Sequence, residues 1–191
     1  MFHTVLERLF SFGEKESYVD LGAYNGDTIR EFLELTEHRY EHIYAVEPDP
    51  RNFAKLRAFA ENEQIRCCSL YNKAVWNAEE ELSFDARGGR MSCLAPAGEK
   101  AVGTLSLDRM LGERPVTYIK MDVEGAESEA LSGGTRALRR WKPKLMIAGY
   151  HHDDDLWRIP LQLWSICPDY RVYLRRHPYV PCWEINFFAT I

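Results

Sequence analysis

Apolar and polar positions alternate along the chain in blocks, as expected when strands are followed by helices. The short apolar runs, which are predicted strands, lie at 18–21, 42–47, 65–71, 116–121 and 144–148. The segments between them place apolar residues three or four positions apart, which is the spacing of an amphipathic helix. These residues are Ile29, Phe32 and Leu33, then Phe53, Leu56 and Phe59, and later Ala126, Ala130, Leu131, Ala137 and Leu138. The alternation predicts an α/β fold with a mainly parallel sheet and helices on both faces.

The segments outside these blocks have weaker patterns. A polar stretch that reaches Thr104 is expected to hold short strands and an exposed loop around Gly88 and Gly89. Pro160 is suited to open a helix. The segments 170–175 and 183–191 alternate residue by residue, which is typical of half-buried antiparallel strands near a sheet edge. The predicted sheet is therefore parallel for most of its width and ends in an antiparallel pair.

The turn after the first predicted strand is the first candidate site. It reads Gly22-Ala23-Tyr24-Asn25-Gly26, and the second strand ends about twenty residues later on Glu47. This is the layout of a βαβ nucleoside site, in which the acid of the second strand holds ribose hydroxyls. A dinucleotide turn needs glycine where this chain has Tyr24, and Asp20 would repel a nearby phosphate. S-adenosylmethionine, which has a ribose, a cationic amino group and no phosphate, fits these residues better. The alternative is that the two glycines serve only a tight turn.

Length, composition and charge restrict the class of protein. A chain of 191 residues is expected to form one domain over 17–191, preceded by a short N-terminal leader or helix at 1–16. The net charge of −5 disfavours general nucleic-acid binding, which usually needs a basic face. The five cysteines are odd in number and lack metal-site spacing, so they are interpreted as reduced thiols of a cytoplasmic protein. No apolar stretch approaches the length of a membrane span.

Several motifs, taken in order, are similar to those of one known family. They are Val19-Asp20-Leu21-Gly22-Ala23-Tyr24-Asn25-Gly26-Asp27-Thr28, Val46-Glu47-Pro48, Ala74-Val75-Trp76, Thr104-Leu105-Ser106-Leu107-Asp108 and Ile119-Lys120-Met121-Asp122-Val123-Glu124-Gly125-Ala126-Glu127. The chain resembles the FkbM family of S-adenosylmethionine-dependent methyltransferases from about Tyr18 to Ala189. The most specific part is Lys-x-Asp-x-Glu-Gly-x-Glu. The resemblance implies the class I methyltransferase fold, a Rossmann-like, mainly parallel twisted sheet with an antiparallel C-terminal strand.

The resemblance also implies which residues bind S-adenosylmethionine and its product S-adenosylhomocysteine. Asp20, Gly22 and Gly26 would shape the pocket for the methionine end, and Glu47 would accept hydrogen bonds from both ribose hydroxyls. Ala74 and Val75 resemble the segment beside the adenine ring. The full expected set is Asp20, Gly22, Ala23, Gly26, Asp27, Thr28, Glu47, Pro48, Ala74, Val75 and Asp122.

The implied reaction is O-methylation of a hydroxyl on a saccharide or another small-molecule or natural-product acceptor. A positioned base helps such a transfer, and the candidates are His151, Glu124 and Asp122, with His151 preferred. For Glu124, a role as a helix-dipole partner is equally open, and for Glu127 that role is preferred. Lys120 is expected to pair with an acid.

The segment 150–155, rich in His and Asp, could hold a divalent metal, but a solvated loop with an aspartate capping the next helix is the preferred interpretation. No metal is therefore predicted.

The sequence also bears on two alternative functions. N-methylation would be supported by an Asn-Pro-Pro-Tyr-like acceptor motif, which the sequence lacks. A cofactor-binding regulator or scaffold that keeps the fold without turnover stays open. The expected partner is a small acceptor rather than a nucleic acid or a membrane, and a homodimer is left open. The segment 85–103 or a partner subunit is expected to close the pocket.

Overall fold

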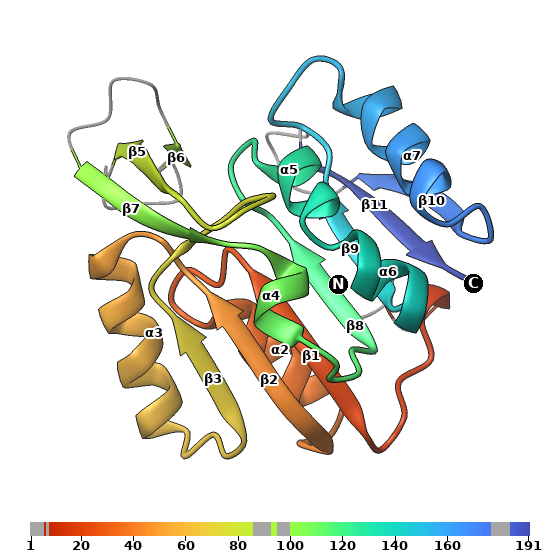
Figure 1. Ribbon diagram of the computed structural model, residues 1–191. Coiled ribbons are helices and arrows are strands. Elements are labelled where there is room, and N and C mark those ends of the chain that lie inside the picture. The colour runs from red at the N-terminus through yellow and green to blue at the C-terminus, as the bar shows by residue number, and fades with distance from the viewer. Residues whose placement is uncertain (1–5, 7, 86–92, 95–99, 177–183) are drawn as a thin grey trace.

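A seven-stranded sheet in the order β10-β11-β9-β8-β1-β2-β3 forms the centre of the molecule (Figure 1). The structure is a computed structural model that describes residues 6, 8–85, 93–94, 100–176 and 184–191. The strands are β1 Glu16–Leu21, β2 Tyr40–Val46, β3 Cys68–Tyr71, β8 Tyr118–Met121, β9 Lys144–Ala148, β10 Arg171–Arg176 and β11 Ile185–Thr190. Strands β3, β2, β1, β8 and β9 pair in parallel, while β11 runs antiparallel to both β9 and β10. The mainly parallel sheet with an antiparallel C-terminal strand is confirmed.

Helices cover both faces of this sheet, as the sequence predicts (Figure 1). On one face lie α2 (Asp27–Leu35), α3 (Pro50–Asn62) and the buried N-terminal residues Leu6 and Phe10. On the other face lie α4 (Leu107–Leu111), α5 (Glu127–Ser132), α6 (Thr135–Trp141) and α7 (Asp155–Ile166). Successive side chains of a strand point to opposite faces, so Val19 packs with the second group and Tyr18 with the first. Within the described residues, no helix has the length and apolarity needed to cross a membrane.

A second, four-stranded sheet stands at one corner of the first. Its strands are β4 Ala74–Val75, β5 Glu81–Asp85, β6 Cys93–Leu94 and β7 Lys100–Leu105, in the order β4-β7-β5-β6. Figure 1 shows it at the upper left, above β3 and α3. The short strands expected between the third and fourth main strands are thus confirmed. The loop expected around Gly88 and Gly89, and most of the segment proposed to close the pocket, lie outside the described residues.

Three local predictions differ from the structure. The helical pattern from Ala126 to Leu138 is split into α5 and α6 at Gly133 and Gly134, where a Cβ atom would lie 2.3 Å from the Trp76 carbonyl oxygen and 2.5 Å from Leu107. Pro160 lies inside α7 instead of opening it, because the helix already begins at Asp155.

The third difference concerns the last strand. Strand β11 was expected to be half-buried, but its residues from Asn186 to Ala189 are all buried. The reason is its position between β9 and β10, which removes it from the sheet edge. The exposed edge strand is β10.

The carboxyl ends of the central strands β1 and β8 approach each other very closely. Gly22 follows β1 with φ +82°, and a Cβ atom on it would lie 1.9 Å from the carbonyl oxygen of Asp122, which follows β8. Beneath this contact, the buried Lys120 ammonium lies 3.3 Å from the Asp20 carboxylate and donates a hydrogen bond of 2.8 Å to the Gly22 carbonyl. Only glycine therefore fits at position 22, and the expected pairing of Lys120 with an acid is confirmed.

Replacing Gly22 with alanine tests this contact. We expect Gly22→Ala to lower the free energy of unfolding by at least about 1 kcal/mol more than Gly112→Ala, because overpacking typically costs about 1–3 kcal/mol. Gly112 also has a positive φ (+59°), but a Cβ atom there would meet nothing within 4 Å, so that variant isolates the backbone strain. Equal losses in urea unfolding of the two variants would contradict the close approach of β1 and β8.

Candidate functional site

The turn that follows β1 is fastened to the end of β2 by backbone hydrogen bonds. The Gly22 and Ala23 amides both donate to the Val46 carbonyl at 3.0 Å, and the Tyr24 amide donates to Glu47 Oε2 at 2.9 Å. Tyr24 adopts φ +48°, an uncommon conformation for a residue with a side chain, and its ring lies beside Lys55 of α3. The turn expected to hold the cofactor is therefore held directly against Glu47.

Glu47 is buried at the end of β2 and serves as an anchor for two segments. Its Oε1 accepts from the Asp49 amide at 2.9 Å, its Oε2 accepts from Tyr24, and the Asn52 side chain forms a further bond. Burial raises the pKa of Glu47 to about 7, although these hydrogen bonds oppose the shift. An ionised carboxylate has about four acceptor sites, so three donors leave capacity for a ligand hydroxyl.

Asp20 and Ala23 support the turn from below, since both side chains are fully buried. Asp20 pairs with Lys120 and accepts a hydrogen bond from the Thr28 hydroxyl. Burial raises the pKa of Asp20, and the nearby Lys120 charge opposes the shift. Asp20 and Thr28, both expected to bind the cofactor, are thus bonded to each other next to the turn.

The remaining expected cofactor residues line the same edge. Gly26, with φ +92°, precedes α2 and faces the Phe59 ring, and Asp27 accepts from the Thr28 amide at 2.9 Å. Pro48 links Glu47 to α3, and its carbonyl accepts from the Asn72 side chain at 3.1 Å.

Ala74 and Val75, expected beside the adenine ring, are buried in β4, which pairs with β7. Asn72, just before them, also donates to the Glu47 carbonyl at 2.9 Å. The segment that leads into β4 is therefore tied to the end of β2.

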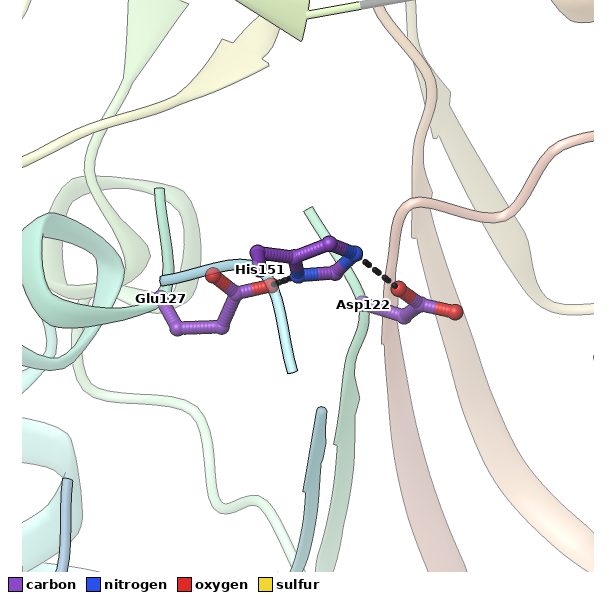
Figure 2. A group of neighbouring side chains, drawn as sticks. All are labelled: Asp122, Glu127 and His151. Carbon is purple, nitrogen blue, oxygen red and sulfur yellow. Dashed lines mark hydrogen bonds and ion pairs between the residues drawn. The ribbon is translucent and has the colours of Figure 1, made fainter. Parts of the chain in front are cut away.

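A second group of polar residues gathers at the adjacent ends of β8 and β9 (Figure 2). His151 Nδ1 lies 2.8 Å from Glu127 Oε1, whereas His151 Nε2 lies 3.6 Å from Asp122 Oδ1 and 3.5 Å from Glu124 Oε2. Figure 2 shows the imidazole ring between the Glu127 and Asp122 carboxylates. The three candidates for the base, His151, Glu124 and Asp122, are thus brought together.

Burial and neighbouring charges shift the pKa values of the side chains in this group. Burial alone would lower the pKa of His151, but the hydrogen bond to Glu127 and the charges of Asp122 and Glu124 outweigh it and raise that pKa. Burial raises the pKa of Glu124 to about 7, with His151 opposing and Asp122 adding to the shift. Tyr150, whose ring contacts His151, donates to Asp122 Oδ1 at 3.3 Å.

Of the two glutamates of the 120–127 motif, only Glu127 lies where the helix dipole can act on it. Glu124 lies in the turn before α5 with φ +52°, outside the helix. Glu127 lies in the first turn of α5, where a carboxylate complements the helix dipole as expected, and its Oε1 also accepts from the Val123 amide at 3.0 Å and bonds His151. Glu127 therefore combines its expected place at the start of the helix with a direct bond to His151.

The aspartates before and at the start of α7 form hydrogen bonds and ion pairs that hold the beginning of that helix. Asp155 accepts from the His151 and His152 amides at 3.1 and 2.8 Å, and both Asp154 and Asp155 pair with Arg158. Among the described residues, Asp122, Glu127 and His151 place one possible ligand atom each within 4.8 Å of one another. Glu127 Oε1, one of these atoms, also bonds the Val123 amide and His151 Nδ1.

Comparison with known proteins identifies the family. Residues 20–181 match the methyltransferase FkbM domain. The chain belongs to the FkbM methyltransferase family. Its structure is similar to that of methyltransferase FkbM from Methylobacillus flagellatus KT, with a TM-score of 0.82 and 26% sequence identity over 95% of this chain. The chain spans only 45% of the length of that relative.

More distant structures share the fold alone. A precorrin-6y C5,15-methyltransferase from Geobacter metallireducens GS-15 has a TM-score of 0.60 and 14% identity, covering 99% of this chain and 86% of that one. A putative methyltransferase from Streptococcus mutans in complex with SAH has a TM-score of 0.58 and 12% identity, covering 100% and 96%. Among curated proteins, none shows significant sequence similarity to the chain.

The family assignment confirms the resemblance seen in the sequence and S-adenosylmethionine as the cofactor. The residues present fit that cofactor, because the Glu47 carboxylate keeps acceptor capacity for a ribose hydroxyl and the Gly22–Gly26 turn lies against it. Two residues of the site were missed in the sequence. Tyr150 and Glu127 contact Asp122 and His151 from other elements, and only their adjacency to the candidates could have indicated them.

A Glu47→Gln variant of the FkbM protein tests the ribose contact. We expect its affinity for S-adenosylhomocysteine at pH 8 to fall at least about tenfold, because charge-assisted hydrogen bonds contribute about 1.5–3 kcal/mol each. In the unmodified protein, affinity should rise from pH 6 to pH 8 as Glu47 ionises, since hydroxyls donate to the carboxylate, and this rise should be weaker in the variant.

Calorimetric titration measures both effects, and Glu41→Gln, an exposed acid on the same strand, is the control. Unchanged affinity in Glu47→Gln would disprove the assignment of Glu47.

Proposed function

We propose that the protein is an S-adenosylmethionine-dependent methyltransferase that methylates a hydroxyl group on a saccharide or another small-molecule or natural-product acceptor. The observation that carries this proposal is the position of His151 Nε2. This nitrogen is buried, has no hydrogen-bond partner in the described part of the chain and faces Asp122 and Glu124 beside the cofactor turn. A bare imidazole nitrogen in that position can accept a hydroxyl proton.

When bound, S-adenosylmethionine supplies a methyl group on a positively charged sulfur. The protein's own contribution is then mainly alignment, which is worth roughly 7–11 kcal/mol in favourable intramolecular cases. Glu47 and the turn at Gly22 form one side of the site. The close contact of Gly22 with Asp122 sets the distance between this side and the polar group around His151. This arrangement supports an acceptor placed between the turn and His151.

Asp122 and Glu124 have separate roles in the proposed reaction. The Asp122 carboxylate, already bonded to Tyr150, accepts a hydrogen bond from the acceptor and orients it. Burial raises the pKa of Glu124 to about 7, so its carboxyl group is partly protonated near neutral pH. It can therefore donate a hydrogen bond to the acceptor when neutral and accept one when ionised. His151 takes the proton of the reacting hydroxyl.

The charge of the site favours a neutral polyhydroxyl acceptor over a phosphate-bearing one. Asp122, Glu124 and Glu127 gather around His151, and the Lys120 ammonium is bonded to Asp20 and the Gly22 carbonyl. Anionic phosphates would be repelled by this group of acids. The preference supports a saccharide or natural-product hydroxyl and disfavours a nucleic acid.

Replacing His151 tests the proposed base. We expect His151→Ala to reduce transfer of tritiated methyl groups to saccharide and polyketide hydroxyls by about 10²–10⁴-fold, the usual contribution of a positioned base. In the unmodified enzyme, kcat/KM should rise with pH around a midpoint above 6.5, because His151 must be neutral and its pKa is raised. His152→Ala, which removes the exposed neighbour, should change the rate only a few-fold.

Normal turnover of His151→Ala between pH 6 and 9 would contradict the role of His151. Cofactor binding by the unmodified protein without transfer to any acceptor would contradict the proposed activity and favour a regulator or scaffold.

A further inference from the structure

Glu127 is buried at the start of α5 and makes contacts beyond its own helix. Its side chain is 1% exposed, and it lies in the first turn of α5. The Oε1 atom bonds both the Val123 amide (3.0 Å) and His151 Nδ1 (2.8 Å), which fixes the carboxylate between the turn after β8 and the loop after β9. A buried acid held in this way keeps its partner in one orientation.

The hydrogen bond to Glu127 determines which nitrogen of His151 carries the proton. Because a carboxylate oxygen accepts, Nδ1 must be the donor, and in a neutral imidazole the other nitrogen is then bare. That other nitrogen, Nε2, is the atom that faces Asp122 and Glu124. Figure 2 shows it directed at the Asp122 carboxylate. Its distances of 3.6 and 3.5 Å to their oxygens are too long for good hydrogen bonds.

The rest of the loop prevents the ring from turning away. The His151 amide donates to Asp155, which is fully buried at the start of α7. The Tyr150 ring contacts the imidazole at a centroid distance of 4.3 Å. His151 is thus held by its backbone, by its neighbour and by the hydrogen bond from its ring to Glu127.

We propose that Glu127 is the positioning residue of the reaction, holding His151 in the tautomer protonated at Nδ1 so that Nε2 faces the acceptor hydroxyl. This inference rests on the proposed function. In the step concerned, the hydroxyl proton passes to Nε2, Nδ1 keeps its own proton, and Glu127 stays ionised against the imidazolium. The same division of roles between a carboxylate and a histidine operates in hydrolytic triads.

The charged and titratable groups around His151 come from four elements. Glu127 belongs to α5, Asp122 and Glu124 follow β8, Tyr150 follows β9, and Asp155 belongs to α7. Further out, Lys120 acts on Glu124, and Glu184 acts on Tyr150. Glu127 is the acid closest to the imidazole, so its removal should lower the affinity of His151 for protons.

The direct test is nitrogen NMR of the histidine rings in the full chain, with no acceptor required. In the unmodified protein, neutral His151 should carry its proton on Nδ1. In Glu127→Gln, its pKa should fall by about 1–3 pH units, the usual effect of losing a neighbouring opposite charge. Glu129→Gln, on the same helix but bonded to Asn77, should leave the titration of His151 unchanged.

Kinetics provide the second readout. Glu127→Gln should lower kcat by about 10²–10⁴-fold. The acid limb of its kcat/KM profile should move to lower pH, while the affinity for S-adenosylhomocysteine and the KM for the acceptor stay within a few-fold. A structural role alone would lower the melting temperature without moving the pH profile.

Two NMR results would overturn the inference directly: a proton on Nε2 of neutral His151 in the unmodified protein, or an unchanged His151 titration in Glu127→Gln. A third result would also overturn it. If micromolar Mn²⁺ broadens the His151 signals and Glu127→Gln abolishes that broadening, the group is a metal site. Absence of methyl transfer by the unmodified protein would instead overturn the proposed function, and the NMR result distinguishes the two failures.

Discussion

The contact between the carboxyl ends of β1 and β8 is the constraint on which the site depends. Gly22 leaves no room for a side chain against the Asp122 carbonyl, and the buried Asp20–Lys120 pair connects the same two strands one layer below. A buried ion pair contributes little net stability, but breaking it by removing one partner typically costs about 3–5 kcal/mol. The pair therefore fixes which strands meet, and the glycine fixes how closely.

The motif at 120–127 has side chains that bond both the turn after β1 and the loop after β9. Lys120 bonds the cofactor turn on β1, whereas Glu127 bonds His151 on the loop after β9. Asp122 and Glu124 lie between them and face His151 Nε2. One short segment thus connects the Gly22–Gly26 turn with the candidate base, which explains why these residue types occur together at this spacing.

The strands, the first helices and the position of Glu47 beside the glycine turn could be predicted because they depend on local order in the chain: a repeat of apolar residues, a glycine turn, and an acid at the end of a strand. The break between α5 and α6 has a local signal in the pair Gly133-Gly134, but the requirement for glycine at position 133 has none, because it comes from the Trp76 carbonyl, far away in the sequence. The link between Glu127 and His151 was missed for the same reason, since a helix-starting glutamate has an ordinary local explanation. Side-chain partners across neighbouring strand ends follow from the sheet order, which local periodicity does not specify.

The most direct test of the site is a crystal structure of the protein bound to S-adenosylhomocysteine. We expect density for a ribose on the Glu47 carboxylate and for the sulfur end of the ligand on the side of Asp122 and Glu124, with the glycine turn unchanged. Ligand density away from Glu47, or a Tyr24 ring occupying this place in crystals saturated with the ligand, would contradict this expectation.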